Sequence, residues 1–230
     1  QQVLMTKMHL PAEVMMLLGT LQATLGAGGD TSALLAQANV LFAELAQIKA
    51  RISAADPSVT EAERTRVETV LPYNLDAWDG YAYEREVILG TALAMQKNLV
   101  VLAGDTHNGW AGQLITDASN PVAGGQAAGV EFATASVSSP GLEEYLSLNT
   151  QDPQAVAQME QVLALLIDDL QYNNLVERGF LTVTFTPSQA LAQWHYVNTI
   201  KAEQYQLSTE RSYQLAMQSG QPHLVNTAIS

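Results

Sequence analysis

The chain has 230 residues, of which 47% are hydrophobic, and this is enough for one sizeable domain or two small ones. With 10 basic and 23 acidic side chains its formal net charge is −13, which disfavours charge-driven binding to nucleic acid or to an anionic membrane surface. The absence of cysteine excludes disulfides and Cys-ligated zinc or iron–sulfur centres within the chain.

The sequence contains no apolar run of the roughly 18–20 residues that a membrane span needs, and no signal peptide pattern. It starts at Gln1, in what reads as the middle of an element. We therefore expect a fragment, or a mature chain cut from a longer precursor.

The first 70 residues have helical periodicity. A proline at Pro11 predicts the first turn of a helix that continues to about residue 25. Apolar residues at three- and four-residue spacing predict a second helix to about Ser53. Thr60 and Glu63 have the spacing of a capping box, which predicts a third helix to about Val70. Residues 26–70 contain no convincing catalytic grouping, so we expect them to have a packing role.

The pattern changes after Pro72. A polar and aromatic loop at 73–81 precedes a predicted helix at 83–95 and a buried strand at 98–103. A second strand is predicted at 130–137, and it ends in a Ser-Ser-Pro-Gly loop. This order is typical of a layered α/β fold, in which ligands gather at the carboxyl ends of strands.

The remaining segments complete the predicted α/β fold. Asp152 and Pro153 begin a helix that we expect to reach Leu170. Strands at 180–186 and 190–197 form a predicted hairpin at a sheet edge. The tail at 201–230 is polar, and only Tyr205, Tyr213 and Leu215 are candidates for docking onto the core.

Asp105 and His107 are the first candidates for chemistry, because they follow the predicted strand at 98–103. In an extended Asp-x-His segment both side chains point the same way and can reach one ion. A carboxylate oxygen and an imidazole nitrogen suit iron, zinc or manganese, and Asn108 adds an amide group. The alternative is a purely structural role, in which Asp105 caps the loop and His107 forms a hydrogen bond within it.

A second cluster in the loop at 73–81 contains acidic, amide and aromatic side chains. Its acids could bind an ion, and Trp78 and Tyr81 could line a pocket. A surface loop anchored by aromatic residues, with Asp76 or Asp79 capping the next helix, is the interpretation that the residues favour. A serine nucleophile is disfavoured because the sequence has no G-x-S-x-G motif.

Taken together, these segments resemble the carboxyl-terminal part of the PhoD-like alkaline phosphatases, a branch of the calcineurin-like metallophosphoesterases. Of the matching stretches, NLVVLAGDTHNGWA contains the candidate ligands and YNLDAWDGYAYERE contains the aromatic loop. The others are QQVLMTKMHLP, GVEFATASVSSPGLE and RGFLTVTFTPSQALAQWHYVNTI, and all five occur in the order of the family.

The resemblance implies a four-layer α/β/β/α sandwich, with 12–72 as a helical insertion, 73–200 as the core and 201–230 as a tail. It implies a phosphate ester substrate, two or more metal ions (iron and calcium), and a periplasmic or secreted location. Asp105 and His107 carry over as metal ligands, with His107 also a candidate catalytic group that faces the phosphate. Trp78, Asp79 and Asn108 carry over as candidates for substrate binding.

The chain lacks the first metal-binding motifs of the family, which lie in an amino-terminal half. We therefore expect that half as a partner, and we expect this chain alone to bind metal poorly and to be inactive. A phospholipase D-type phosphodiesterase of the same fold and a non-catalytic phosphoesterase-like binding module remain as alternatives.

Overall fold

The structure is a computed structural model, and it describes residues 1–121, 123–146 and 148–227. The chain divides into two compact units. The sheet unit comprises Gln1–Lys7, Asn74–Tyr145 and Asp169–Ser230, and the helical unit comprises Met8–Tyr73 and Leu146–Asp168. In the described part of the chain, no helix is both long enough and apolar enough to cross a membrane.

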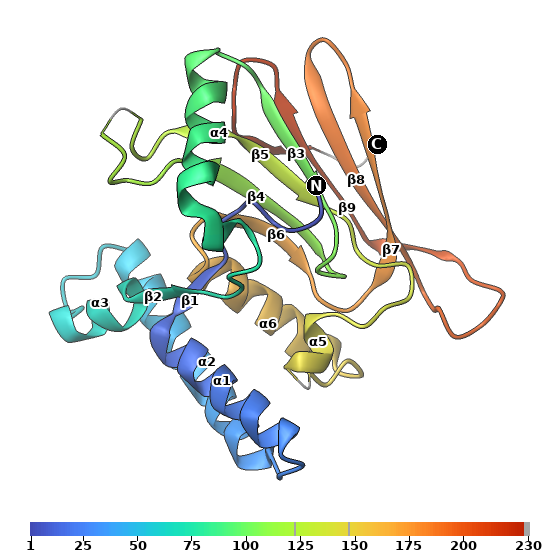
Figure 1. Cartoon of the computed structure of the whole chain (residues 1–230). Coiled ribbons are helices and arrows are strands. Elements are labelled where there is room, and N and C mark those ends of the chain that lie inside the picture. Colours follow the sequence, from blue (N-terminus) through green and yellow to red (C-terminus); the bar gives the residue numbers. More distant parts are fainter. Residues whose placement is uncertain (122, 147, 228–230) are drawn as a thin grey trace. The chain divides into compact units, whose positions relative to one another are not determined.

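The helical unit confirms the three helices expected in the first 70 residues. They are α1 (Ala12–Gly26), α2 (Ser32–Ser53) and α3 (Glu61–Glu68), shown in Figure 1. The short strands β1 (His9–Pro11) and β2 (Val70–Pro72) pair antiparallel beside them. The expected capping box of α3 is present, with Thr60 and Glu63 each binding the other's main-chain N–H.

A fourth helix of this unit, α6 (Pro153–Leu166), packs against α2. The prediction that it continues to Leu170 is wrong. The chain turns extended at Ile167, and Leu170 begins the strand β6 (Leu170–Asn174) of the sheet unit. Leu170 has the spacing of the apolar face of the helix, but it is buried as part of a strand.

The sheet unit contains two four-stranded sheets. The first has the order β3-β5-β4-β6, with β3 (Leu99–Ala103) parallel to β5 (Ala127–Ala133), and β4 (Gly109–Ile115) antiparallel to β5 and β6. The helix α4 (Ala82–Ala94) covers one face of this sheet (Figure 1). Leu89 of α4 packs there with Met5, Val101 and Leu114.

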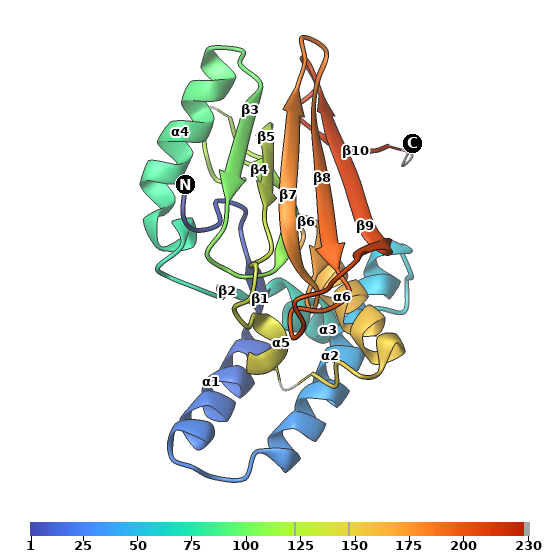
Figure 2. The ribbon, with the colours of Figure 1, turned by 90° about the vertical axis from the view of Figure 1, so that its right-hand side faces the viewer.

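The second sheet has the order β10-β9-β8-β7, entirely antiparallel. Its strands are β7 (Arg178–Phe185), β8 (Gln189–Val197), β9 (Leu207–Gln218) and β10 (Leu224–Asn226). Figure 2 shows this sheet facing the first one, on the side away from α4. Phe132 and Trp194 meet edge to face between the two sheets. A mixed α/β fold is therefore established, with the layers helix, sheet and sheet in the sheet unit.

The tail at 201–230 contains β9, a strand that the sequence does not predict because its first half is polar. The docking predicted for Leu215 and Tyr213 is confirmed, since Leu215 is buried in the core and Tyr213 packs against it, whereas Tyr205 is exposed. The strand expected at 130–137 is β5, which ends at Ala133. The strand β4 was not foreseen, because its consecutive buried residues lack the alternation of a half-exposed strand.

Candidate functional site

The candidate site is the loop that joins β3 to β4, residues 104–108. Asp105 and His107 both have left-handed backbone conformations, with φ values of 63° and 64°. The extended Asp-x-His segment expected from the sequence is therefore wrong, because an extended strand requires negative φ. The exposed Asp105 and the half-exposed His107 lie on a loop of successive bends.

Left-handed backbone is unfavourable for residues with a Cβ atom, so each case calls for an explanation. Among the residues that the structure describes, four non-glycine residues have positive φ. Ala55 and Gln96 follow the last residues of α2 and α4, where helices commonly end in this conformation. Asp105 and His107 have no helix end to explain them, and such clusters of backbone strain are typical of functional sites.

Hydrogen bonds hold this loop on the side of Asp105. The Thr106 N–H donates to the Gly104 carbonyl at 2.7 Å, which closes a tight turn centred on Asp105. The Thr106 hydroxyl accepts from Trp110 Nε1 at 2.9 Å. Gln2 donates from Nε2 to Asp105 Oδ1 at 3.1 Å, and its carbonyl accepts from the Gly104 N–H at 3.1 Å. The Asp105 carboxylate is therefore oriented by the amino-terminal segment.

The imidazole of His107 is oriented by a different segment. Its Nδ1 lies 2.6 Å from the carbonyl oxygen of Pro140. Because a carbonyl only accepts hydrogen bonds, Nδ1 carries a proton, and in the neutral imidazole Nε2 is then the nitrogen with the lone pair. Metal-binding histidines typically have this arrangement, in which one ring nitrogen donates to a carbonyl and the other binds the ion.

Asn108 is fully buried, and both ends of its carboxamide bind main chain. Its Nδ2 donates to the Leu175 carbonyl at 2.6 Å, and its Oδ1 accepts from the Leu142 N–H at 2.7 Å. The expectation that Asn108 binds substrate stays a prediction. The contacts instead point to a role in holding the loop at 140–142.

Glu143 and Arg178 form a buried ion pair next to Asn108, each side chain about 8% exposed. No pattern in the sequence selects Glu143, because no spacing relates it to Arg178, 35 residues away. Contacts between such distant segments require the fold and leave no periodic signal in the sequence.

Trp78 and Asp79 lie in the 3₁₀ helix η1 (Trp78–Tyr81), which leads into α4. Trp78 is half-buried and packs against the apolar cluster around Leu89. The charge of Asp79 acts on the buried guanidinium of Arg85. Substrate binding by either residue stays a prediction.

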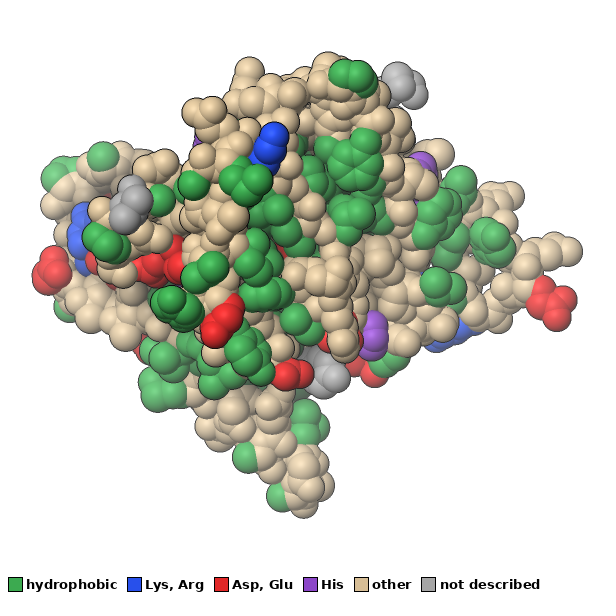
Figure 3. Space-filling model, turned by 45° about the horizontal axis from the view of Figure 1, so that its top comes forward, with side chains coloured by type: hydrophobic (Ala, Val, Ile, Leu, Met, Phe, Trp, Pro, Cys, Tyr) green, Lys and Arg blue, Asp and Glu red, His purple; other side chains and the backbone are tan. Residues whose placement is uncertain are grey.

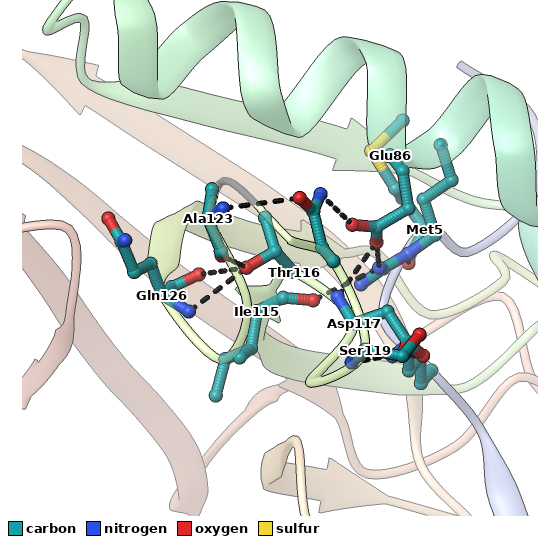
Figure 4. A network of polar contacts seen from close by, with 11 residues as sticks. Met5, Glu86, Ile115, Thr116, Asp117, Ser119, Ala123 and Gln126 are labelled. Carbon is teal, nitrogen blue, oxygen red and sulfur yellow. Dashed lines mark hydrogen bonds and ion pairs between the residues drawn. The ribbon is translucent and has the colours of Figure 1, made fainter.

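A polar network around Glu86 connects α4 with the loop after β4 (Figure 4). Arg85 forms an ion pair with Glu86. Arg85 is 1% exposed and donates to the carbonyls of Met5 and Ile115 at 2.7 and 3.0 Å. Burial lowers the pKa of Arg85, and the carboxylates of Asp169, Glu86, Asp79 and Glu131 oppose that shift. Glu86 accepts from the Asp117 N–H at 3.0 Å, so the cluster ties α4 to the loop after β4.

Glu131 on β5 binds the amino-terminal segment that contains Gln2. Its fully buried carboxylate accepts from the N–H groups of Met5 and Thr6 at 2.8–2.9 Å and from Gln1 Nε2 at 2.8 Å. Burial raises the pKa of Glu131, and these hydrogen bonds oppose the shift. The segment that contacts Asp105 is thus anchored in the first sheet.

Asp105 and His107 are donors of the right chemical types for a metal, but they do not make a complete site. Within residues 1–121, 123–146 and 148–227, no three or more His, Asp or Glu side chains are grouped so that they could hold an ion. Basic side chains are sparse on the face shown in Figure 3.

Comparison with known proteins supplies the family context. A family model described as PhoD-like phosphatase matches residues 27–194. Alkaline phosphatase D of Bacillus subtilis (strain 168) is 29% identical over 142 residues, which is 61% of this chain and 22% of that protein. A solved structure described as "Structure of PhoD" is 25% identical, with a TM-score of 0.50, and the match covers 70% of this chain and 28% of the other. The chain thus spans about a quarter of the length of these relatives.

Proposed function

This chain belongs to the PhoD-like phosphatase family, and from that premise we propose that it supplies one side of the active site of a metal-dependent phosphoesterase. The other metal ligands would come from an amino-terminal half of the same protein. The small share of the relatives that the chain covers supports this division. We propose that the two parts together complete the four-layer sandwich and act in the periplasm or outside the cell.

The observation that carries the proposal is the left-handed backbone at both Asp105 and His107. Two ligand-type side chains are held in an unfavourable conformation at the carboxyl end of β3, with no helix end to account for it. Strain of this kind persists only where the surrounding structure enforces it. Gln2 and Pro140, from two distant segments of the chain, provide that enforcement.

In the proposed mechanism, Asp105 contributes a carboxylate oxygen and His107 contributes Nε2 to hold metal ions, which we propose to be iron and calcium. When bound, such ions would offset the negative charge of the phosphoryl oxygens and make a water molecule more nucleophilic. The Nδ1–H of His107 donates a hydrogen bond to the Pro140 carbonyl, which favours the tautomer whose Nε2 would act as a base or ligand. Trp78, Asp79 and Asn108 remain candidates for substrate contact.

The test uses the full-length protein with p-nitrophenyl phosphate and bis-p-nitrophenyl phosphate as substrates. Replacing Asp105→Asn keeps the size of the side chain and removes its charge, so we expect kcat/KM to fall at least about 100-fold. The matched control is Asp117→Asn, since Asp117 lies in an exposed loop where it binds Lys7 and Ser119. Unchanged turnover in Asp105→Asn would show that the ligand assignment is wrong.

The substrate profile of the same preparation separates the alternatives. Hydrolysis of phosphate monoesters and simple diesters supports the alkaline phosphatase assignment. Cleavage restricted to phosphatidylcholine vesicles would identify a phospholipase D-type phosphodiesterase. No turnover and sub-stoichiometric metal in the full-length protein would identify a non-catalytic binding module.

A further inference from the structure

We propose that Glu143, together with Arg178 and Asn108, positions His107 through the peptide group between Pro140 and Gly141. This proposal rests on the proposed function of His107 as a metal ligand. It assigns a role to a buried ion pair that lies outside the loop at 104–108. Glu143 and Arg178 are positioning residues, because neither contacts the imidazole.

The carbonyl of Pro140 and the N–H of Gly141 belong to the same peptide bond, whose atoms are held in a plane. The carbonyl faces His107 Nδ1 at 2.6 Å, and the N–H donates to Glu143 Oε1 at 3.1 Å. The orientation of the acceptor for His107 is therefore set by the carboxylate of Glu143.

The position of Glu143 is fixed in turn by Arg178 and Asn108. Arg178 Nη2 donates to Glu143 Oε1, and its Nη1 donates to the Val176 carbonyl at 2.6 Å. Asn108 Nδ2 lies 3.4 Å from Glu143 Oε2, a long contact beside its shorter bond to the Leu175 carbonyl. A buried carboxylate without a cationic partner is costly, so the ion pair with Arg178 stabilises the position of Glu143 beneath the loop.

The loop at 140–142 packs closely on this network. A Cβ atom at Gly141 would lie 2.5 Å from Asn108 Oδ1, so only glycine permits this approach. The next residue, Leu142, donates its N–H to the same oxygen at 2.7 Å. Because two successive N–H groups are bound to buried side chains, the Pro140 carbonyl cannot rotate without breaking the network.

The consequence concerns the tautomer of His107. A fixed carbonyl acceptor places the proton on Nδ1 and leaves Nε2 as the nitrogen that can bind an ion. If the peptide group were free to turn, both tautomers of the imidazole would be populated. The buried network therefore selects the state of His107 that the proposed function needs.

The test measures that tautomer directly, in the 230-residue chain without metal. Long-range ¹H–¹⁵N spectra are recorded at about pH 8, where an ordinary histidine is neutral, and His107→Gln identifies the signals. In the unsubstituted chain we expect the His107 ring to give one ¹⁵N signal typical of a protonated nitrogen, from Nδ1, and one typical of an unprotonated nitrogen, from Nε2. In Glu143→Ala, which removes the acceptor of the Gly141 N–H, we expect both signals to move towards their mean. Arg178→Met, which removes the cationic partner of Glu143, is the second variant in case Glu143→Ala does not fold, and we expect it to move the signals in the same direction.

The matched control is Glu177→Ala, since Glu177 pairs with Arg211 at 2.8 Å and lies beside Arg178 in the sequence. We expect it to leave the His107 signals unchanged. A folded Glu143→Ala or Arg178→Met variant with the signals of the unsubstituted chain would overturn the proposal. This readout needs neither metal nor activity, so it is separate from a failure of the proposed phosphoesterase function.

Discussion

A single peptide group connects His107 to Glu143, binding the imidazole through the Pro140 carbonyl and the carboxylate through the Gly141 N–H. This relationship links a half-exposed loop to a buried ion pair. The candidate site is therefore supported by the interior of the sheet unit, as sites that require fixed side chains commonly are.

The strained backbone at Asp105 predicts opposite effects on stability and activity. Asp105→Gly removes an unfavourable left-handed conformation of about 1 kcal/mol, and it also removes the exposed hydrogen bond from Gln2. We expect the free energy of unfolding in urea to be unchanged or slightly higher, while phosphatase activity of the full-length protein is lost.

The matched variant is Gln96→Gly, at the left-handed position after α4. It should raise the free energy of unfolding by about 0.5–1 kcal/mol and leave activity intact. A loss of more than about 1 kcal/mol in Asp105→Gly would contradict the view that this residue is kept for function rather than for stability.

Replacing the buried Asn108 with alanine should lower the free energy of unfolding substantially. Asn108→Ala leaves the Leu142 N–H and the Leu175 carbonyl buried without their partner. An unsatisfied buried polar group costs about 1–3 kcal/mol, so we expect urea denaturation to show a loss of about 2–4 kcal/mol.

Asn226→Ala is the control for Asn108. Asn226 is exposed and accepts a hydrogen bond from the Tyr213 hydroxyl. The change should stay within about 0.5 kcal/mol. Equal effects of the two substitutions would mean that the buried network contributes nothing to the stability of the sheet unit.

The helical unit should show its own pH dependence through Glu63. Hydrogen bonds from Arg51, and then from the Thr60 N–H and hydroxyl, lower the pKa of Glu63 to about 2. A carboxyl group whose pKa is lower in the folded state stabilises it above the ordinary pKa. This contribution is lost as the pH falls from about 4.5 towards about 2.

Glu63→Gln should therefore lower stability near neutral pH and flatten the decline of stability between pH 4.5 and 2, as followed by urea unfolding at a series of pH values. The control is Glu61→Gln, in the same first turn of α3 but outside the capping box. If Glu63→Gln kept the pH profile of the unsubstituted protein in this range, the assigned interactions of Glu63 would be wrong.

Local signals in the sequence were reliable where one segment determined its own structure. The capping box at Thr60 and Glu63, and the apolar periodicity of α2, predicted helices that the structure confirms. The strand before the Asp105 loop was equally clear, because Leu99–Ala103 is a continuous apolar run. These features depend on neighbouring residues only.

Contacts between segments that lie far apart in the chain could not be predicted from the sequence pattern. The strand β9 has a polar first half, and its place in the second sheet is set by pairing with β8. The ion pair between Glu143 and Arg178 joins residues 35 positions apart. The left-handed conformations at Asp105 and His107 were missed for the same reason, since Gln2 and Pro140 hold them from distant segments.

The most direct test of the central claim is the metal content of the full-length protein and of its Asp105→Asn and His107→Ala variants, measured by elemental analysis after purification. Our account predicts stoichiometric metal in the unsubstituted protein and affinity reduced by about 10-fold or more in each variant. Full metal occupancy with unchanged affinity in both variants would contradict the claim that these two residues hold the ion.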